Sequence, residues 1–103
     1  MSDPMRIRAI EKDGVIDVKI LMKHDMESGQ RLDAFGKTIP AWHITNVTAR
    51  LKDKVIFSAQ FGPAVSKDPL LNFKFRGAEK GDEIMVNWFD NHGDQRIDKA
   101  KII

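Results

Sequence analysis

The chain has 103 residues, of which 42% are hydrophobic and 31% charged, and this is the size and composition of one folded domain. Its 17 basic residues are balanced by 15 acidic ones and alternate with them along the chain. A nucleic-acid-binding protein would gather its Lys and Arg on one face, so nucleic acid is not an expected partner. Cysteine is absent, which excludes disulfides, thiolate catalysis and Cys-bound metal centres.

The sequence shows neither a secretion signal nor a membrane segment. Residues 1–8 lack the apolar core of a secretory signal peptide. No stretch approaches the ~18 apolar residues that a transmembrane helix needs. The residues alone therefore predict a protein that stays in the cytosol or is exported by another route, without contact to a membrane.

Alternation of apolar and polar residues with a period of two predicts β-strands along most of the chain. The pattern is found in six segments: 5–10, 15–22, 54–61, 71–75, 84–88 and 95–103. In the third of these we expect Val55, Phe57, Ala59 and Phe61 to point inward. Turns are predicted at 52–53, 80–82 and 91–94 from their Gly, Asn and Asp residues.

Segment 41–51 alternates as well, but its phase changes midway. Trp42 and Ile44 belong to one register, whereas Val47, Ala49 and Leu51 belong to the other. An extra residue in the strand shifts the phase in this way. We therefore predict a β-bulge near Thr45 and Asn46.

Seven short strands in one chain predict an all-β protein, an immunoglobulin-like antiparallel β-sandwich that spans residues 1–103 as a single domain. A small barrel of about five strands would leave too much of the chain unused. Two prolines exclude a central strand from segment 62–69, which we expect to cross between the sheets. The expected core includes Val18, Ile20, Val47, Phe57, Phe73, Val86 and Trp88.

Segment 23–40 breaks the strand pattern and is longer than the ~12–15 residues beyond which a loop is usually functional or disordered. It contains four apolar residues that we expect to anchor it in an ordered form: Met26, Leu32, Phe35 and Ile39. Two interpretations remain open. The segment is a binding loop on a rigid sandwich, or its part 31–39 is a hairpin that merely extends a sheet.

Candidate catalytic and metal-binding residues are sparse. Cu(I) favours thioether and imidazole ligands. Such ligands are available at Met22, His24 and Met26, and also at Met5 and His43. Met22 continues the apolar row of its strand, however, and is expected in the core. The acidic residues around His24 have no recognised metal spacing, and no serine lies in a nucleophile elbow. We therefore expect a binding protein without catalytic activity, cofactor or metal.

Met85 and Phe89 lie on the polar phase of segment 84–88, so this strand has apolar side chains on both faces. The outer face of a sandwich is polar unless another surface covers it, although single exposed aromatic residues are common. Two such residues on one strand favour a subunit interface.

The most distinctive sequence in the chain, His24-Asp25-Met26-Glu27-Ser28-Gly29-Gln30-Arg31, resembles the SoxZ family. The resemblance continues through three further groups of residues: Asp33, Gly36 and Ile39-Pro40; Val55–Ala59, Pro63-Ala64 and Pro69-Leu70-Leu71; and Trp88, Asp90 and Gly93. It therefore covers nearly the whole chain. Departures from the family pattern are modest and fall at Asp25, Asp68 and Leu70.

The resemblance implies a subunit of a sulfur carrier in thiosulfate oxidation. SoxZ proteins pair with SoxY, a second β-sandwich whose flexible arm bears one cysteine to which sulfur intermediates are attached. The heterodimer visits the other Sox enzymes in the periplasm, and SoxZ is exported together with its signal-bearing partner. When isolated, the chain is also expected to form homodimers through its exposed apolar face.

Partner or arm contacts are expected from the loop and from the outer strand face, at His24, Met26, Glu27, Ser28, Gly29, Arg31, Met85 and Phe89. An anionic sulfur group would benefit from the charge-assisted hydrogen bonds of Arg31 and Lys37, and of His24 when protonated. The alternative is that Arg31 and Glu27 pair with each other to hold the loop.

Overall fold

The structure, a computed structural model, describes residues 3–103, which form seven strands in two antiparallel sheets. Their bounds are β1 Arg6–Lys12, β2 Val15–Leu21, β3 Ile44–Leu51, β4 Lys54–Gln60, β5 Leu70–Phe75, β6 Glu83–Asp90 and β7 Gln95–Lys101. The predicted all-β sandwich is confirmed. Residues 1 and 2, which belong to the amino-terminal segment considered above, lie outside the described residues.

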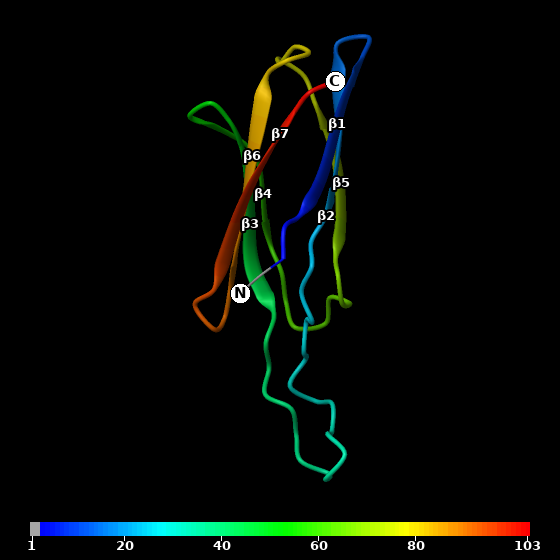
Figure 1. The fold of residues 1–103 in the computed structure, drawn as a ribbon, viewed down its shortest axis with the longest axis vertical. Helices are drawn as coiled ribbons and strands as arrows, with labels where there is room; N and C mark the ends of the chain where they lie inside the picture. The colour runs from blue at the N-terminus through cyan, green and yellow to red at the C-terminus, as the bar shows by residue number, and fades with distance from the viewer. Residues whose placement is uncertain (1–2) are drawn as a thin grey trace.

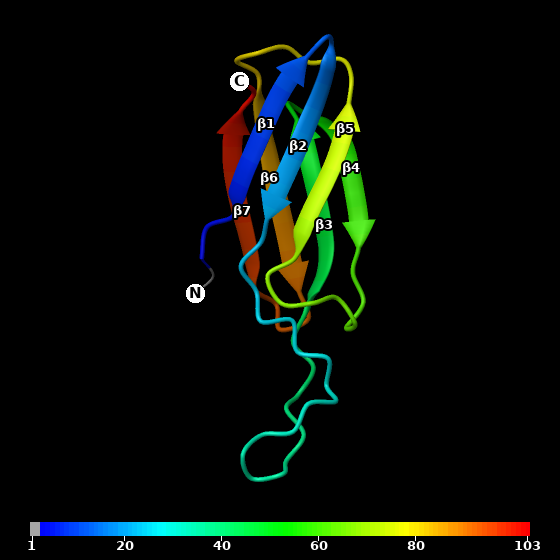
Figure 2. The ribbon, with the colours of Figure 1, turned by 90° about the vertical axis from the view of Figure 1, so that its right-hand side faces the viewer.

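The two sheets lie face to face, with the order β1-β2-β5 in one and β4-β3-β6-β7 in the other (Figures 1 and 2). In a constant-type immunoglobulin domain the fourth strand joins the sheet of the first two strands. Here β4 pairs with β3 instead. Segment 61–69 connects β4 to β5 and so crosses between the sheets, as predicted. Among residues 3–103 there is no helix that could span a membrane.

Short turns join the hairpins of the sandwich. The β6–β7 turn, 91–94, and the β3–β4 turn, Lys52 and Asp53, lie where they were predicted. The β1–β2 turn consists of Asp13 and Gly14, both with positive φ (54° and 80°), which suits the right-handed twist of a two-residue hairpin. This turn was not among those predicted from the sequence, although Asp-Gly is a strong hairpin signal.

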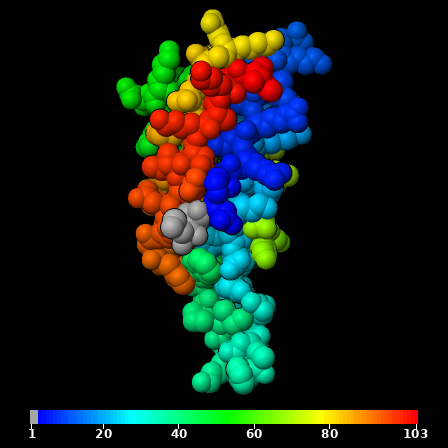
Figure 3. Space-filling model, viewed as in Figure 1, coloured from blue at the N-terminus to red at the C-terminus, as the bar shows by residue number. Residues whose placement is uncertain are grey.

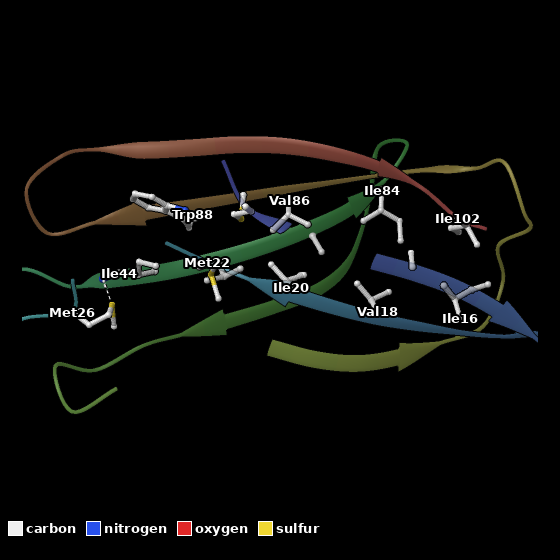
Figure 4. Close-up of a cluster of buried hydrophobic side chains, with 14 residues drawn as sticks. Ile16, Val18, Ile20, Met22, Met26, Ile44, Ile84, Val86, Trp88 and Ile102 are labelled. Atoms are coloured by element: carbon white, nitrogen blue, oxygen red, sulfur yellow. Dashed lines mark hydrogen bonds between the residues drawn. The ribbon is translucent and has the colours of Figure 1, made fainter. Parts of the chain in front are cut away.

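The core fills the space between the sheets (Figure 4). Five of the seven predicted core side chains are fully buried there: Val18, Ile20, Val47, Val86 and Trp88. Phe57 and Phe73 are only half-buried, because β4 and β5 are the edge strands on one side of the sandwich. Their rings stack on each other at 4.4 Å and cover the core at that open edge.

Two register shifts bend the larger sheet. The first lies between Ile44 and Asn46 and confirms the predicted bulge. The second, between Ala49 and Arg50, was not predicted. It pairs Arg50 with Val55 on the outer face, so Val55 is 47% exposed and its predicted inward orientation is wrong. An inserted residue reverses the side-chain phase beyond it.

Hydrogen bonds donated by backbone amides close the other edge of the sandwich, between β1 and β7. The amide of Met5 donates a hydrogen bond to Asp98 Oδ2 at 2.9 Å. At the carboxyl end, the amide of Ile103 donates to the carbonyl of Ala9, and the amide of Glu11 donates to the carbonyl of Ile103. The last residues therefore lie against β1, as the red and blue surfaces of Figure 3 show.

Candidate functional site

Residues 27–42 form a hairpin arm that projects from one end of the sandwich (Figures 2 and 3). Glu27 and Trp42 exchange two backbone hydrogen bonds at the base of the arm, at 2.6 and 2.9 Å. Leu32 and Thr38 form a second bridge near the tip. The segment is therefore ordered, as expected. It is a hairpin, but it extends neither sheet.

The tip of the arm is shaped by Asp33. Its carboxylate Oδ1 accepts hydrogen bonds from the amides of Phe35 and Lys37 at 2.8 and 2.9 Å. Phe35 is 89% exposed and Leu32 is 58% exposed, so the prediction that they anchor the loop is wrong. A two-stranded hairpin has no second layer against which to bury them, and hydrogen bonds hold the turn instead.

Glu27 and Arg31 pair along the stem of the arm. Arg31 donates from Nε to Glu27 Oε1 at 3.0 Å and from Nη2 to Oε2 at 2.6 Å. The hydrogen bond from the guanidinium lowers the pKa of the Glu27 carboxyl, and the carboxylate raises the pKa of Arg31. The pairing that the sequence left as an alternative is thus present. It leaves the outer side of the Arg31 side chain, which is 63% exposed, open to solvent.

Below the arm, the His24 side chain is buried and has no free ring nitrogen. Nδ1 accepts a hydrogen bond from the amide of Met26 at 3.0 Å, so the proton of the neutral ring lies on Nε2. Nε2 then donates to Asp90 Oδ2, also at 3.0 Å. The expectation that protonated His24 presents a donor to an anion does not fit this geometry, because a second ring proton would displace the Met26 amide.

Asp90 is the acceptor on which the arm base converges. Trp42 Nε1 donates to Oδ2 at 2.8 Å, and the amides of His92 and Asp94 donate to Oδ1, each at 2.9 Å. Burial pushes the pKa of this carboxyl up, but the hydrogen bonds from His24, Trp42 and the two amides outweigh burial and hold the pKa below its usual value. The cluster ties the arm to the β6–β7 turn.

The remaining predicted loop residues have different environments. Met26 is buried, with a positive φ of 53°, and its sulfur accepts a hydrogen bond from the amide of Ile44 at 3.3 Å (Figure 4). Its place is in the core rather than on a contact surface. Ser28 is exposed and its Oγ accepts from the amide of Gln30. Gly29 has a φ of 85°, and a Cβ there would lie 3.1 Å from that of Ala41.

Part of the predicted site does come together. Glu27, Ser28 and Arg31 line a hollow of about 540 Å³ beside the arm, and Lys67 of the crossover segment joins them. Two cations, Arg31 and Lys67, and two carboxylates, Glu27 and Asp25, thus line this space. The sequence pointed to the loop residues but gave no signal for Lys67, which is distant along the chain.

Met85 and Phe89 lie elsewhere, on the outer face of the larger sheet. Their side chains point to the same side of β6 as that of Asn87, and the Phe89 side chain is 44% exposed. Val55 and Ile97, 47% and 50% exposed, share this face from β4 and β7. We call these four residues the outer apolar stripe, although Arg50 of β3 stands between Val55 and Met85. It extends the two-residue prediction over three strands.

The copper hypothesis required shared thioether and imidazole ligands. The structure places Met22 wholly inside the core and engages the Met26 sulfur and both His24 nitrogens in hydrogen bonds. Within residues 3–103, no three His, Asp or Glu side chains gather in a way that could hold a metal ion. Independence from metal stays a prediction, which thermal unfolding with and without a chelator tests.

Sequence reasoning missed Asp90 and Trp42 as parts of the arm base. Asp90 belongs to the Trp88-x-Asp90-x-x-Gly93 pattern that contributes to the family resemblance, and this pattern alone does not indicate what the carboxylate binds. Asp90 continues the inward phase of Ile84, Val86 and Trp88, and a carboxylate at such a position indicates a buried group that needs hydrogen-bond donors. Trp42 was noted only for its phase, and its ring stacks on His92 at 5.3 Å.

Comparison with known proteins gives one family and one fold. The family model described as "Sulphur oxidation protein SoxZ" matches residues 5–101. No curated protein sequence matches the chain. Two structures of variants of superoxide reductase (neelaredoxin) from Archaeoglobus fulgidus, both in the reduced form, are similar in fold. One has a TM-score of 0.60 at 20% identity and covers 97% of this chain and 89% of that one. The other has a TM-score of 0.57 at 19% identity and covers 95% and 84%.

Proposed function

The chain belongs to the SoxZ family of sulfur oxidation proteins, and from this membership we propose that it is the non-catalytic subunit of a heterodimeric sulfur carrier. Its partner is a SoxY-like subunit whose cysteine-bearing arm carries the sulfur intermediates, and the pair works in the periplasm after joint export. The role of this chain is to bind that subunit and to help present its arm to the other enzymes of the system.

The observation that carries this proposal is the outer apolar stripe. Four apolar side chains stand on one sheet face, where a lone sandwich would have polar ones: Val55, Met85, Phe89 and Ile97. Permanent interfaces are rich in such side chains, because a lasting contact keeps them from water. The stripe therefore supports a stable partner on this face.

The hollow beside the arm supports a second contact. Arg31 and Lys67 offer cationic donors there, and Ser28 offers a hydroxyl. A sulfonate or persulfide on a partner cysteine is anionic and would accept charge-assisted hydrogen bonds from these groups. We place the substrate-bearing end of the partner's arm in this hollow, which is a proposal about position and not about catalysis.

The proposal is tested by co-expression with the SoxY-like subunit and measurement of the dissociation constant. The double variant Met85→Ser, Phe89→Ser should bind at least about tenfold more weakly, because buried aromatic side chains dominate such interfaces. The control is Leu70→Ser, which removes a side chain 66% exposed on the other sheet. Equal binding by the two variants, or no binding by the natural chain, would remove the proposal.

A further inference from the structure

The outer face of the smaller sheet, which faces the viewer in Figure 2, is strongly basic. The period of two places four cations of β1 and β2 and one of β5 on that side, and a sixth follows β5 directly: Arg6, Arg8, Lys12, Lys19, Lys74 and Arg76. All six are exposed. On the outward positions of these strands Asp17 is the single acidic residue. We call this surface the basic face.

The positive charge of the basic face is offset within the chain only by Asp17, which lies directly opposite Lys74 on the neighbouring strand. Arg8 and Lys19 are direct cross-strand partners, and like charges in that position destabilise a sheet. None of the ion pairs among residues 3–103 involves the six cations. Asp17 Oδ1 accepts a hydrogen bond from Asn72 at 2.7 Å. The other cations have no acidic cross-strand partner, so an external anionic surface would relieve the repulsion between them.

This clustering corrects the expectation drawn from the sequence. Basic and acidic residues do alternate along the chain, but most acidic residues lie in turns and loops, as Asp13, Asp53 and Asp82 do. Five of the six cations of the basic face lie on strands, where every second residue points to the same side. A net charge of only +2 thus coexists with a face that carries six cations and one acidic residue.

We propose that the basic face is a docking surface for the acidic surface of another protein. The inference rests on the proposed function, since the partner we assign is an enzyme that the assembled carrier visits. Charge complementarity accelerates encounter and yields contacts that form and dissociate quickly, which suits a carrier that moves between enzymes. The outer apolar stripe faces the opposite way from the other sheet, so both surfaces are usable at once (Figure 1).

The composition of the basic face favours a protein over a nucleic acid. Apolar side chains stand between the cations, with Ile10 37% and Leu70 66% exposed and Leu21 half-buried. Mixed apolar and charged surfaces are typical of protein interfaces. The outward positions of β1, β2 and β5 hold no aromatic residue, whereas single-stranded nucleic acid is bound largely by stacking on aromatic rings.

The test uses the purified heterodimer of this chain with its SoxY-like partner and, as probes, the individual purified Sox enzymes of the same organism. The triple variant Arg8→Gln, Lys19→Gln, Lys74→Gln should lower the association rate with at least one enzyme about tenfold at low ionic strength. The difference should shrink as salt rises above ~0.15 M. The control, Lys52→Gln, Lys54→Gln, Lys101→Gln, removes the same charge from the other sheet and its β3–β4 turn and should change the rate less than about twofold.

Equal rates for the triple variant and the control would overturn the proposal, as would an association rate that does not depend on salt. Oligothymidylate and phosphatidylglycerol vesicles are run in parallel. The heterodimer could bind either of these probes more tightly than it binds the enzymes, with the triple variant but not the control losing that binding. This outcome would assign the basic face to nucleic acid or membrane and would also overturn the proposal. If no heterodimer forms, that result refutes the proposed function but does not test the basic face. The isolated chain is then tested with a polyglutamate peptide, which the triple variant must bind more weakly than the control if the inference is correct.

Discussion

Asp90 accepts four hydrogen bonds from a fully buried position, and this single carboxylate joins the arm base, the β6–β7 turn and the core. Its pKa is held below that of a free aspartate, because the hydrogen bonds outweigh the opposing effect of burial. Folding therefore favours the ionised form. The stabilisation is complete above the unfolded-state pKa of about 3.9 and is lost as the pH falls through the lower folded-state pKa.

Replacing Asp90 tests this role. Asp90→Asn keeps the size but exchanges an acceptor oxygen for an amide donor that faces other donors. We expect a loss of about 2–3 kcal/mol in the free energy of unfolding at pH 7, as for a buried hydrogen bond to a charged group. The loss should diminish as the pH drops below ~4, where the natural chain loses the same contribution. Denaturant titrations at several pH values measure it. Asp53→Asn, in an exposed turn, is the control, and an equal effect of the two would contradict the role of Asp90.

Two glycines of the arm offer a matched comparison. Both have positive φ, 85° at Gly29 and 76° at Gly36, so an added Cβ strains either backbone. Only at Gly29 would that Cβ also crowd Ala41, at 3.1 Å, because Gly36 has open space around it. Gly29→Ala should speed amide exchange at Glu27 and Trp42 about tenfold, while Gly36→Ala leaves these two amides nearly unchanged. Similar exchange in both variants would show that the arm base tolerates the crowding.

The hairpin arm is the element whose form matters most to the proposed function. It is held by backbone bridges, the Asp33 turn and the Glu27–Arg31 pair, and none of these depends on burial of apolar surface. Its conformation is thus largely independent of the sandwich beyond its base. A change in the arm should therefore alter binding without altering the fold.

Arg31→Ala makes this separation measurable. The side chain is exposed, so the isolated chain should lose no more than ~0.5 kcal/mol in the free energy of unfolding. Assembly with the partner, or turnover by the assembled system, should weaken because a cation is lost from the hollow. Lys80→Ala, an exposed cation in the turn before β6 and outside both sheet faces, should affect neither. A different outcome is that Arg31→Ala unfolds the isolated chain while the complex that still forms is fully active. The hairpin arm of this chain would then have a structural role, and the cysteine-bearing arm of the partner would be recognised elsewhere.

The sequence predicted the strands well, because period-two patterns such as Val18 and Ile20 on β2 directly record which face is buried. It predicted the bulge at Asn46 for the same reason. The second shift, beside Arg50, escaped notice because Ile56 and Phe57 are both apolar and hide the change of phase.

The site was predicted in part. Local pairs such as Glu27 and Arg31 can be read from spacing, whereas the convergence on Asp90 depends on contacts distant in the chain.

At the scale of the whole molecule, the two outer sheet faces differ in kind. One carries the outer apolar stripe and the other carries the basic face, and the core separates them. An apolar face without its partner tends to find a substitute. The like-charged face does not, since two copies would repel each other there.

The isolated chain should accordingly self-associate through the stripe in concentrated solution. Sedimentation velocity over a range of concentrations should show dimers that dissociate on dilution. Phe89→Ser should shift the equilibrium toward monomer, because it removes a side chain 44% exposed on that face. Adding the SoxY-like subunit should replace the homodimer. A strict monomer at high concentration would count against the stripe as an interface.

The position of the arm between β2 and β3 has a topological consequence. Cleavage of the peptide bond at its tip would divide the chain into a piece with β1 and β2 and a piece with the other five strands. The pieces would remain joined by the β2–β5 ladder and by the contacts of Ile103 with β1. Covalent continuity at Phe35 and Gly36 is therefore dispensable for cohesion of the sandwich. A fluorophore or an inserted domain placed there would report on the conformation of the arm without straining the β-sheets.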